Sequence, residues 1–160
     1  MKSLAASLLG LWLVVGMAAA GAWAVSPELA YVAGSYQGRA VLGKVVDGKT
    51  SPGEATPVEV ELKQKAQRLS GLLTVGDAKA DKIVLEINKG KVEGSHLWFE
   101  GDELLWKVRF SGDFADGKIK GRVRFTSRDP TKELFGASQI KDYTPVQMGG
   151  PLEMTRQRGD

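Results

Sequence analysis

The chain has 160 residues, no cysteine, one histidine, and 22 basic against 19 acidic residues, for a formal net charge of +3. These numbers exclude disulfides and make a structural zinc site implausible, since cysteine and histidine are its usual ligands. A pI near 9.1 with so small a net charge falls short of a nucleic-acid-binding domain. We expect no nucleic acid partner and no metal site, although composition alone does not exclude a carboxylate site for a harder cation.

The first 24 residues have the three regions of a secretory signal peptide. Lys2 supplies the positive charge, residues 4–15 are largely apolar, and Ala22-Trp23-Ala24 is an A-x-A cleavage pattern before Val25. Cleavage would leave residues 25–160 as a single domain of 136 residues with a net charge of +2. The prediction is an exported protein, periplasmic or extracellular, with no transmembrane segment after cleavage. The alternative is an uncleaved anchor, because the apolar stretch is close to the lower limit for spanning a bilayer.

From residue 25 onward the hydrophobic period is two, which is typical of half-buried β-strands. Val58, Val60 and Leu62, for example, alternate with charged residues. Such runs, separated by turn signals, predict eight strands at residues 34–46, 57–65, 69–76, 82–88, 91–99, 104–114, 118–127 and 151–157. Residues 47–56 and 128–150 are predicted to be long connections.

The second connection carries its own signals. A short helix is expected at 130–135, with Asp129 as N-cap, Pro130 in the first turn and Gly136 after the end. The apolar residues of 128–150 favour either a lid or plug at one end of the domain, or ordinary packing with a further short strand near 139–147.

A two-residue turn at Asp116-Gly117 predicts the register of the hairpin around it. A type I′ turn there pairs Phe110 with Val123, so that apolar or glycine positions meet on one face of the hairpin. The other face then carries a cluster of cations, with Arg109 directly opposite Arg124.

A second turn, at Lys89-Gly90, predicts where the only histidine lies. It pairs Ile83 with His96 and places His96 and Trp98 on the inner face. A three-residue turn at 101–103 would also set Trp98 opposite Trp106, whereas a two-residue turn would move that pairing by one.

Five strands contain the pattern apolar–x–glycine, with the glycine on the core-facing side in the predicted registers. The glycines are Gly38, Gly71, Gly94, Gly112 and Gly121. Glycine weakens a strand, so its repeated use indicates strong coiling or close approach across a closed interior. The fold class is therefore all-β, an antiparallel up-and-down meander closed into an eight-stranded barrel; an open curved sheet or a sandwich is the alternative.

The first strand, opening with Gly34-Ser35-Tyr36-Gln37-Gly38, resembles the calycin group of lipocalin-like and avidin-like barrels. The first strand of those barrels carries a G-x-W motif, and a basic residue late in the barrel packs over that aromatic ring. The resemblance implies that Tyr36 takes the place of the tryptophan and that Arg156 or Arg158 makes the cation–π contact.

The candidate ligand-binding residues are His96, Trp98, Trp106 and Tyr36. A histidine in a tryptophan-lined cavity could orient a small apolar or amphipathic molecule. The alternative is that His96 is a hydrogen-bonded barrel residue or lies at a rim. No G-x-S-x-G, Walker or dinucleotide-binding loop occurs, so we expect neither an enzyme nor a cofactor.

A second candidate site is the cationic face of the predicted hairpin. It comprises Lys107, Arg109, Lys120, Arg122 and Arg124. Like charges directly opposite one another cost stability, so this face favours contact with an anionic lipid headgroup, polysaccharide or acidic protein. The alternative is a solvated basic face balanced by nearby acids.

Two functions fit these patterns. The leading hypothesis is an exported non-enzymatic protein that holds a small hydrophobic or amphipathic ligand inside the barrel. The alternative is an exported interaction or inhibitor module, in which the barrel is packed and binds a protein partner or anionic surface through its outside.

Overall fold

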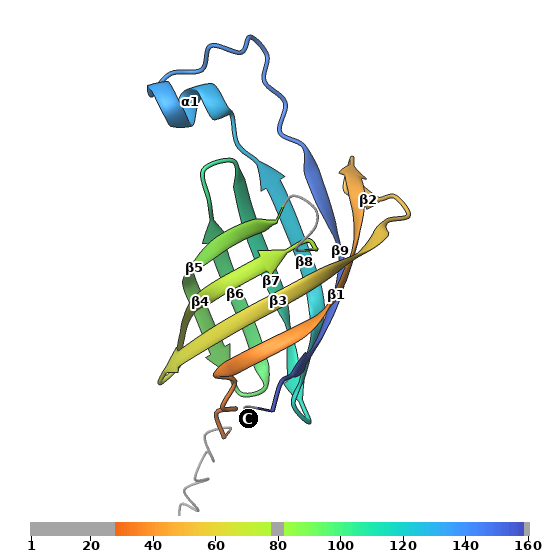
Figure 1. Cartoon of the computed structure of the whole chain (residues 1–160), viewed down its shortest axis with the longest axis vertical. Coiled ribbons are helices and arrows are strands. Elements are labelled where there is room, and N and C mark those ends of the chain that lie inside the picture. The colour runs from red at the N-terminus through yellow and green to blue at the C-terminus, as the bar shows by residue number, and fades with distance from the viewer. Residues whose placement is uncertain (1–27, 78–81, 159–160) are drawn as a thin grey trace, which may run out of the picture.

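Residues 28–77 and 82–158, which the computed structural model describes, form a closed eight-stranded antiparallel barrel with one extra short strand (Figure 1). The barrel strands are β1 (Gly34–Val46), β3 (Glu54–Lys65), β4 (Arg68–Val75), β5 (Ile83–Glu93), β6 (His96–Asp102), β7 (Trp106–Ala115), β8 (Lys118–Ser127) and β9 (Gln147–Arg156). Neighbours in the chain pair in sequence, and β1 pairs with β9 to close the barrel. The predicted barrel is confirmed, and the open sheet and the sandwich are wrong.

The two long connections contain more structure than predicted. Residues 47–56 include the extra strand β2 (Lys49–Thr50), which folds back on β1 through a turn at Asp47 and Gly48, and β3 already begins at Glu54. Strand β9 begins at Gln147, four positions before the predicted start.

The barrel interior is a packed core. Phe99 and Phe110 stack there with ring centroids 4.9 Å apart, and Leu73 and Leu85 have no exposed surface. All eight barrel strands contribute buried hydrophobic side chains. An eight-stranded barrel is just wide enough for side chains to fill, which these residues do.

Glycines allow the closing strands to approach each other. A Cβ on Gly150 of β9 would lie 1.8 Å from the carbonyl oxygen of Val41 in β1, and one on Gly38 would lie 1.9 Å from that of Glu153. The predicted strand glycines Gly38, Gly112 and Gly121 therefore serve close backbone contact, as expected.

The segment 28–33 closes one end of the barrel. Val32 is fully buried, and its backbone N–H donates to Oε1 of Gln64 at 2.7 Å. The Gln64 amide donates in turn to the carbonyl of Ala30 at 3.1 Å. This lead-in segment thus belongs to the core of the domain.

Tyr36 and Arg156 form the pair that the calycin resemblance implies. The Arg156 guanidinium lies 5.4 Å from the Tyr36 ring centroid, and its Nη2 donates to Tyr36 Oη at 2.8 Å. Tyr36 Oη donates to the carbonyl of Val32 at 2.8 Å. Burial raises the pKa of the Tyr36 phenol above its ordinary value, although the hydrogen bond and charge of Arg156 act to lower it.

The register of the β7–β8 hairpin is confirmed. Asp116 and Gly117 both have positive φ, at 51° and 73°, as a type I′ turn requires. Phe110 lies opposite Val123, and Arg109 lies opposite Arg124.

The predicted turn at Lys89-Gly90 is wrong. Strand β5 runs through Gly90, with an irregularity between Ile87 and Lys89, and the chain reverses at Gly94, whose φ of 62° suits a tight hairpin turn. Glu93 therefore pairs with His96, and the alternation of β6 is opposite to the predicted one.

Helix α1 (Pro130–Phe135) has the predicted bounds and caps. Asp129 accepts hydrogen bonds from the backbone N–H of Thr131 and Lys132, and Gly136 takes the left-handed conformation. No residue of α1 is buried, and the connection projects beyond one end of the barrel (Figure 1). It does not plug the barrel.

The predicted signal peptide, residues 1–24, lies outside the described residues, so export and cleavage stay predictions. Within 28–77 and 82–158, no helix combines the length and the hydropathy needed to cross a bilayer.

Candidate ligand-binding groove on the outer face

The four residues predicted to bind a ligand do not gather in one cavity. Tyr36 is buried at the closed end, and Trp106 packs against the core at the start of β7. His96 and Trp98 point outward, because Leu97 and Phe99 alternate with them and are fully buried. The predicted inward orientation of His96 and Trp98 is wrong; the shifted hairpin turn is the reason.

The five predicted anion-contact residues do share the outer face of β7 and β8. They are Lys107, Arg109, Lys120, Arg122 and Arg124. The strand registers arrange this face and its neighbours into rows that run across β5 to β9. Three rows matter for the site, and each is defined here by its residues.

The histidine row holds more acidic than basic side chains. It consists of Glu93, His96, Asp113, Lys120 and Glu153. Nδ1 of His96 lies 3.0 Å from Oδ1 of Asp113, and Nζ of Lys120 lies 3.1 Å from Oε1 of Glu153. Glu93 pairs with Lys91 of the next row. With three carboxylates and one lysine, this row does not favour a bound anion.

The tryptophan row and the arginine row hold an excess of positive charge. The tryptophan row is Lys91, Trp98, Ser111, Arg122 and Pro151; the arginine row is Lys89, Glu100, Arg109, Arg124 and Gly149. Glu100 pairs with both Arg109, at 2.6 Å, and Lys107, at 3.7 Å. Among the residues that the structure describes, neither Arg122 nor Arg124 has an ion pair or a side-chain hydrogen bond.

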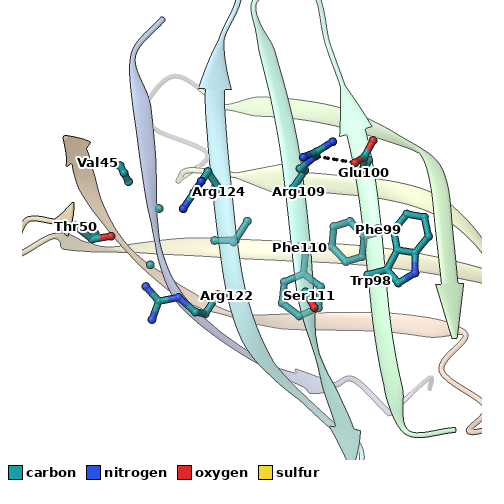
Figure 2. Close-up of a pocket in the computed structure, with 13 residues that line it drawn as sticks. Val45, Thr50, Trp98, Phe99, Glu100, Arg109, Phe110, Ser111, Arg122 and Arg124 are labelled. Carbon is teal, nitrogen blue, oxygen red and sulfur yellow. Dashed lines mark ion pairs between the residues drawn. The ribbon is translucent and has the colours of Figure 1, made fainter. Parts of the chain in front are cut away.

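A groove of about 450 Å³ lies over these two rows (Figure 2). Its outward-facing lining comprises Trp98, Glu100, Arg109, Ser111, Arg122 and Arg124, with Val45 and Thr50 from β1 and β2. Gly149 and Gly150 of β9 and the buried residues Phe99, Phe110 and Val123 also line it.

Figure 2 shows how the groove is divided. Arg122 and Arg124 lie on the side nearer Thr50 and Val45, and Trp98 lies on the opposite side. Arg109 points toward Glu100, away from the other two arginines. Trp98 and Arg122 stand in one row on strands two places apart, so about 10 Å separates their backbones.

Sequence reasoning missed several groove residues. Ser111 lies between Trp98 and Arg122 in the tryptophan row, and its Oγ is 3.1 Å from Nε2 of His96. Thr50 arrives through β2, which was predicted to be part of a loop. The predicted β7–β8 register, now confirmed, already placed Ser111 beside Arg122. The sequence did not show that Trp98 lies on the other side of Ser111, because the β6 register was predicted wrongly.

Comparisons with known proteins inform the fold. No protein-family model matches the chain, and no curated protein matches its sequence. The chain is similar to the solved structure of EF1p2_mFAP2b bound to DFHBI, with a TM-score of 0.52 and 11% identity over 79% of this chain and 94% of that one. At this identity the likeness supports the β-barrel fold alone.

Proposed function

We propose that this chain is an exported binding protein whose outer groove holds an anionic ligand with an aromatic or apolar part. The observation that carries the proposal is the pair Arg122 and Arg124, which have no acidic partner among the described residues and share a groove with Trp98.

The charges of the groove favour an anion. Arg124 lies opposite Arg109, whose own carboxylate partner Glu100 also serves Lys107. Cations directly across a strand pair repel each other, and a bound anion would relieve that repulsion. A carboxylate, sulfonate or phosphate can accept two parallel hydrogen bonds from one guanidinium, at about 1.5–3 kcal/mol for each charge-assisted bond.

The other side of the groove favours an aromatic or apolar group. Trp98 is an outward-facing aromatic residue of the lining, and its backbone lies about 10 Å from that of Arg122. A volume of about 450 Å³ suits a small organic molecule. The ligand would then be amphipathic, as the sequence suggested, but bound outside the barrel.

The packed interior argues against a ligand inside the barrel. Phe99, Phe110 and Phe125 occupy that space with at most 3% exposure. A ligand there would have to displace core side chains from a close-packed interior. That EF1p2_mFAP2b is bound to DFHBI supports ligand binding by such a barrel in general.

Two related dyes test the proposal. Anilinonaphthalene sulfonate carries a sulfonate on an aromatic system, and N-phenyl-1-naphthylamine lacks the sulfonate. We expect the sulfonate to bind one site per chain with quenching of tryptophan emission, and the neutral dye not to bind. The double variant Arg122→Ser/Arg124→Ser should weaken the sulfonate by at least about tenfold, or 1.4 kcal/mol.

The control is Arg39→Ser/Arg68→Ser, which removes the same charge from exposed outer positions on β1 and β4. This variant should bind the sulfonate as the parent protein does. Equal binding of both dyes, unaffected by the Arg122→Ser/Arg124→Ser change, would place the ligand in the interior and refute the groove.

A further inference from the structure

We propose that the groove also carries a nucleophile: Ser111, activated by His96 and Asp113, cleaves aryl esters whose acyl part bears an anionic group. This inference rests on the proposed function, because the same groove would hold the substrate.

Three side chains on two neighbouring strands have the order of a nucleophile, a base and an acid. Oγ of Ser111 lies 3.1 Å from Nε2 of His96, and Nδ1 of His96 lies 3.0 Å from Oδ1 of Asp113. When Nδ1–H donates to the carboxylate, Nε2 is left as the acceptor for the serine hydroxyl. Both distances are within hydrogen-bond reach, as this chemistry requires.

The strand register explains why the three meet. His96 of β6 lies directly opposite Asp113 of β7, and Ser111 precedes Asp113 by two residues on the same face. His96 therefore sits beside both side chains. No local motif marks this arrangement, since Ser111 has no neighbouring glycine loop and His96 is fifteen residues away.

The position of Ser111 links this triad to the groove. In the tryptophan row, Ser111 lies between Trp98 and Arg122. A molecule with its aromatic end on Trp98 and its anionic end at Arg122 passes over Oγ of Ser111. The scissile carbonyl lies between these two ends in an aryl ester of a dicarboxylic acid, which sets the substrate class.

The reaction balances with water as the co-reactant. Oγ of Ser111 attacks the carbonyl carbon while its proton passes to Nε2 of His96. The carbon–oxygen bond to the aryl group breaks, and the proton from His96 leaves with the phenol. Water then attacks the acyl-serine, again through His96, releasing the carboxylic acid and restoring the Ser111 hydroxyl. Asp113 stays ionised throughout and orients the imidazole.

The strand setting restricts the chemistry to reactive esters. The backbone N–H groups of β7 serve the pairing with β6 and β8, so they do not form the donor pair that stabilises an oxyanion in efficient hydrolases. One such donor is worth about 10²–10³ in rate. Good leaving groups such as phenols are therefore substrates, whereas amides are not.

The test uses two 4-nitrophenyl esters of equal chain length: the adipate monoester, with a free carboxylate, and the neutral hexanoate. We expect the parent protein to hydrolyse the adipate about 100-fold faster than Ser111→Ala, the range of one general base. His96→Gln should fall to the same level, and Asp113→Asn should lose at least about tenfold. Peptide mass spectrometry of the quenched reaction should find the acyl group on Ser111.

The matched control is Ser70→Ala, an exposed serine on the outer side of β4, which should retain the parent rate. Hydrolysis of the hexanoate should be at least about tenfold slower if Arg122 and Arg124 hold the carboxylate. Equal rates for the parent protein, Ser111→Ala and His96→Gln would overturn the triad.

Titration with anilinonaphthalene sulfonate separates the two proposals. His96→Gln, at a residue outside the groove lining, should bind this dye normally while losing hydrolysis, which supports both. Dye binding without any Ser111-dependent hydrolysis overturns the triad and leaves the groove. Hydrolysis that depends on Ser111 in a protein that fails to bind the dye supports the triad and refutes the proposed anionic groove.

Discussion

The phenol of Tyr36 holds together three segments that are far apart in the sequence. It donates to the carbonyl of Val32 in the lead-in segment and accepts from Arg156 on the last strand. Tyr36→Phe would leave this carbonyl without its donor and the guanidinium without one acceptor. We expect a loss of about 1–3 kcal/mol in the free energy of unfolding, measured by urea denaturation. Tyr31→Phe, at a side chain that is 68% exposed, should stay within about 0.5 kcal/mol of the parent protein.

The same residue predicts a response to alkaline pH. Burial holds the pKa of Tyr36 above its ordinary value of 10.0, so the folded state favours the neutral phenol more than the unfolded state does. The stabilisation is complete below about pH 10 and is lost as pH rises through the higher native pKa. Between pH 9 and pH 11 the parent protein should lose more unfolding free energy than Tyr36→Phe. Parallel losses in the two proteins would contradict this assignment.

Individual residues differ in how far the sequence could place them. Arg109 and Arg124 could be set opposite each other because the Asp116-Gly117 turn is local and needs positive φ at both positions. Trp98 could not be placed, since its orientation depends on which of two nearby glycines, Gly90 or Gly94, makes the turn.

Tertiary contacts decide between those glycines in the β5–β6 hairpin. A Cβ on Gly90 would lie 2.8 Å from Cβ of Leu69 in β4 and 3.1 Å from Cβ of Phe99 in β6. Gly90 is therefore required by packing between strands, which a local pattern does not show. The period of two located the other six barrel strands, but the predicted strands 82–88 and 91–99 are wrong in their bounds, because β5 extends to Glu93 and β6 begins at His96. This misplaced turn reversed the faces of β6 and separated the histidine from its true neighbours.

The seam between β1 and β9 gives a prediction about these two elements. Gly150→Ala would bring a methyl group within 1.8 Å of the Val41 carbonyl oxygen, so the two backbones must separate. Overpacking of this kind costs about 1–3 kcal/mol. We expect that loss in urea denaturation, with faster amide exchange confined to β1 and β9. Unchanged exchange along both strands would show that the seam tolerates a side chain at Gly150.

For the whole molecule, the sequence predicted a closed barrel but did not predict how full it is. Alternating apolar residues indicate which side chains face inward, whereas the free volume depends on how those side chains meet across the barrel. The stacking of Phe99 on Phe110, its partner on the adjacent strand, also helps to fill the interior. The structure also places Trp98 on the cationic outer face and not in the interior. The outer face is therefore the stronger of the two candidate sites.

The seam also bears on how the chain folds. Tyr36 and Arg156 are 120 residues apart, yet they meet in the pair that seals the closed end. The barrel cannot close until the last strand is available, so contact order is high and folding should be slow compared with proteins built on local contacts. Until then β1 and β8 each present an unpaired edge, a surface prone to association with other chains. A chain that loses its final ten residues would lack most of β9, so the edges of β1 and β8 would stay unpaired.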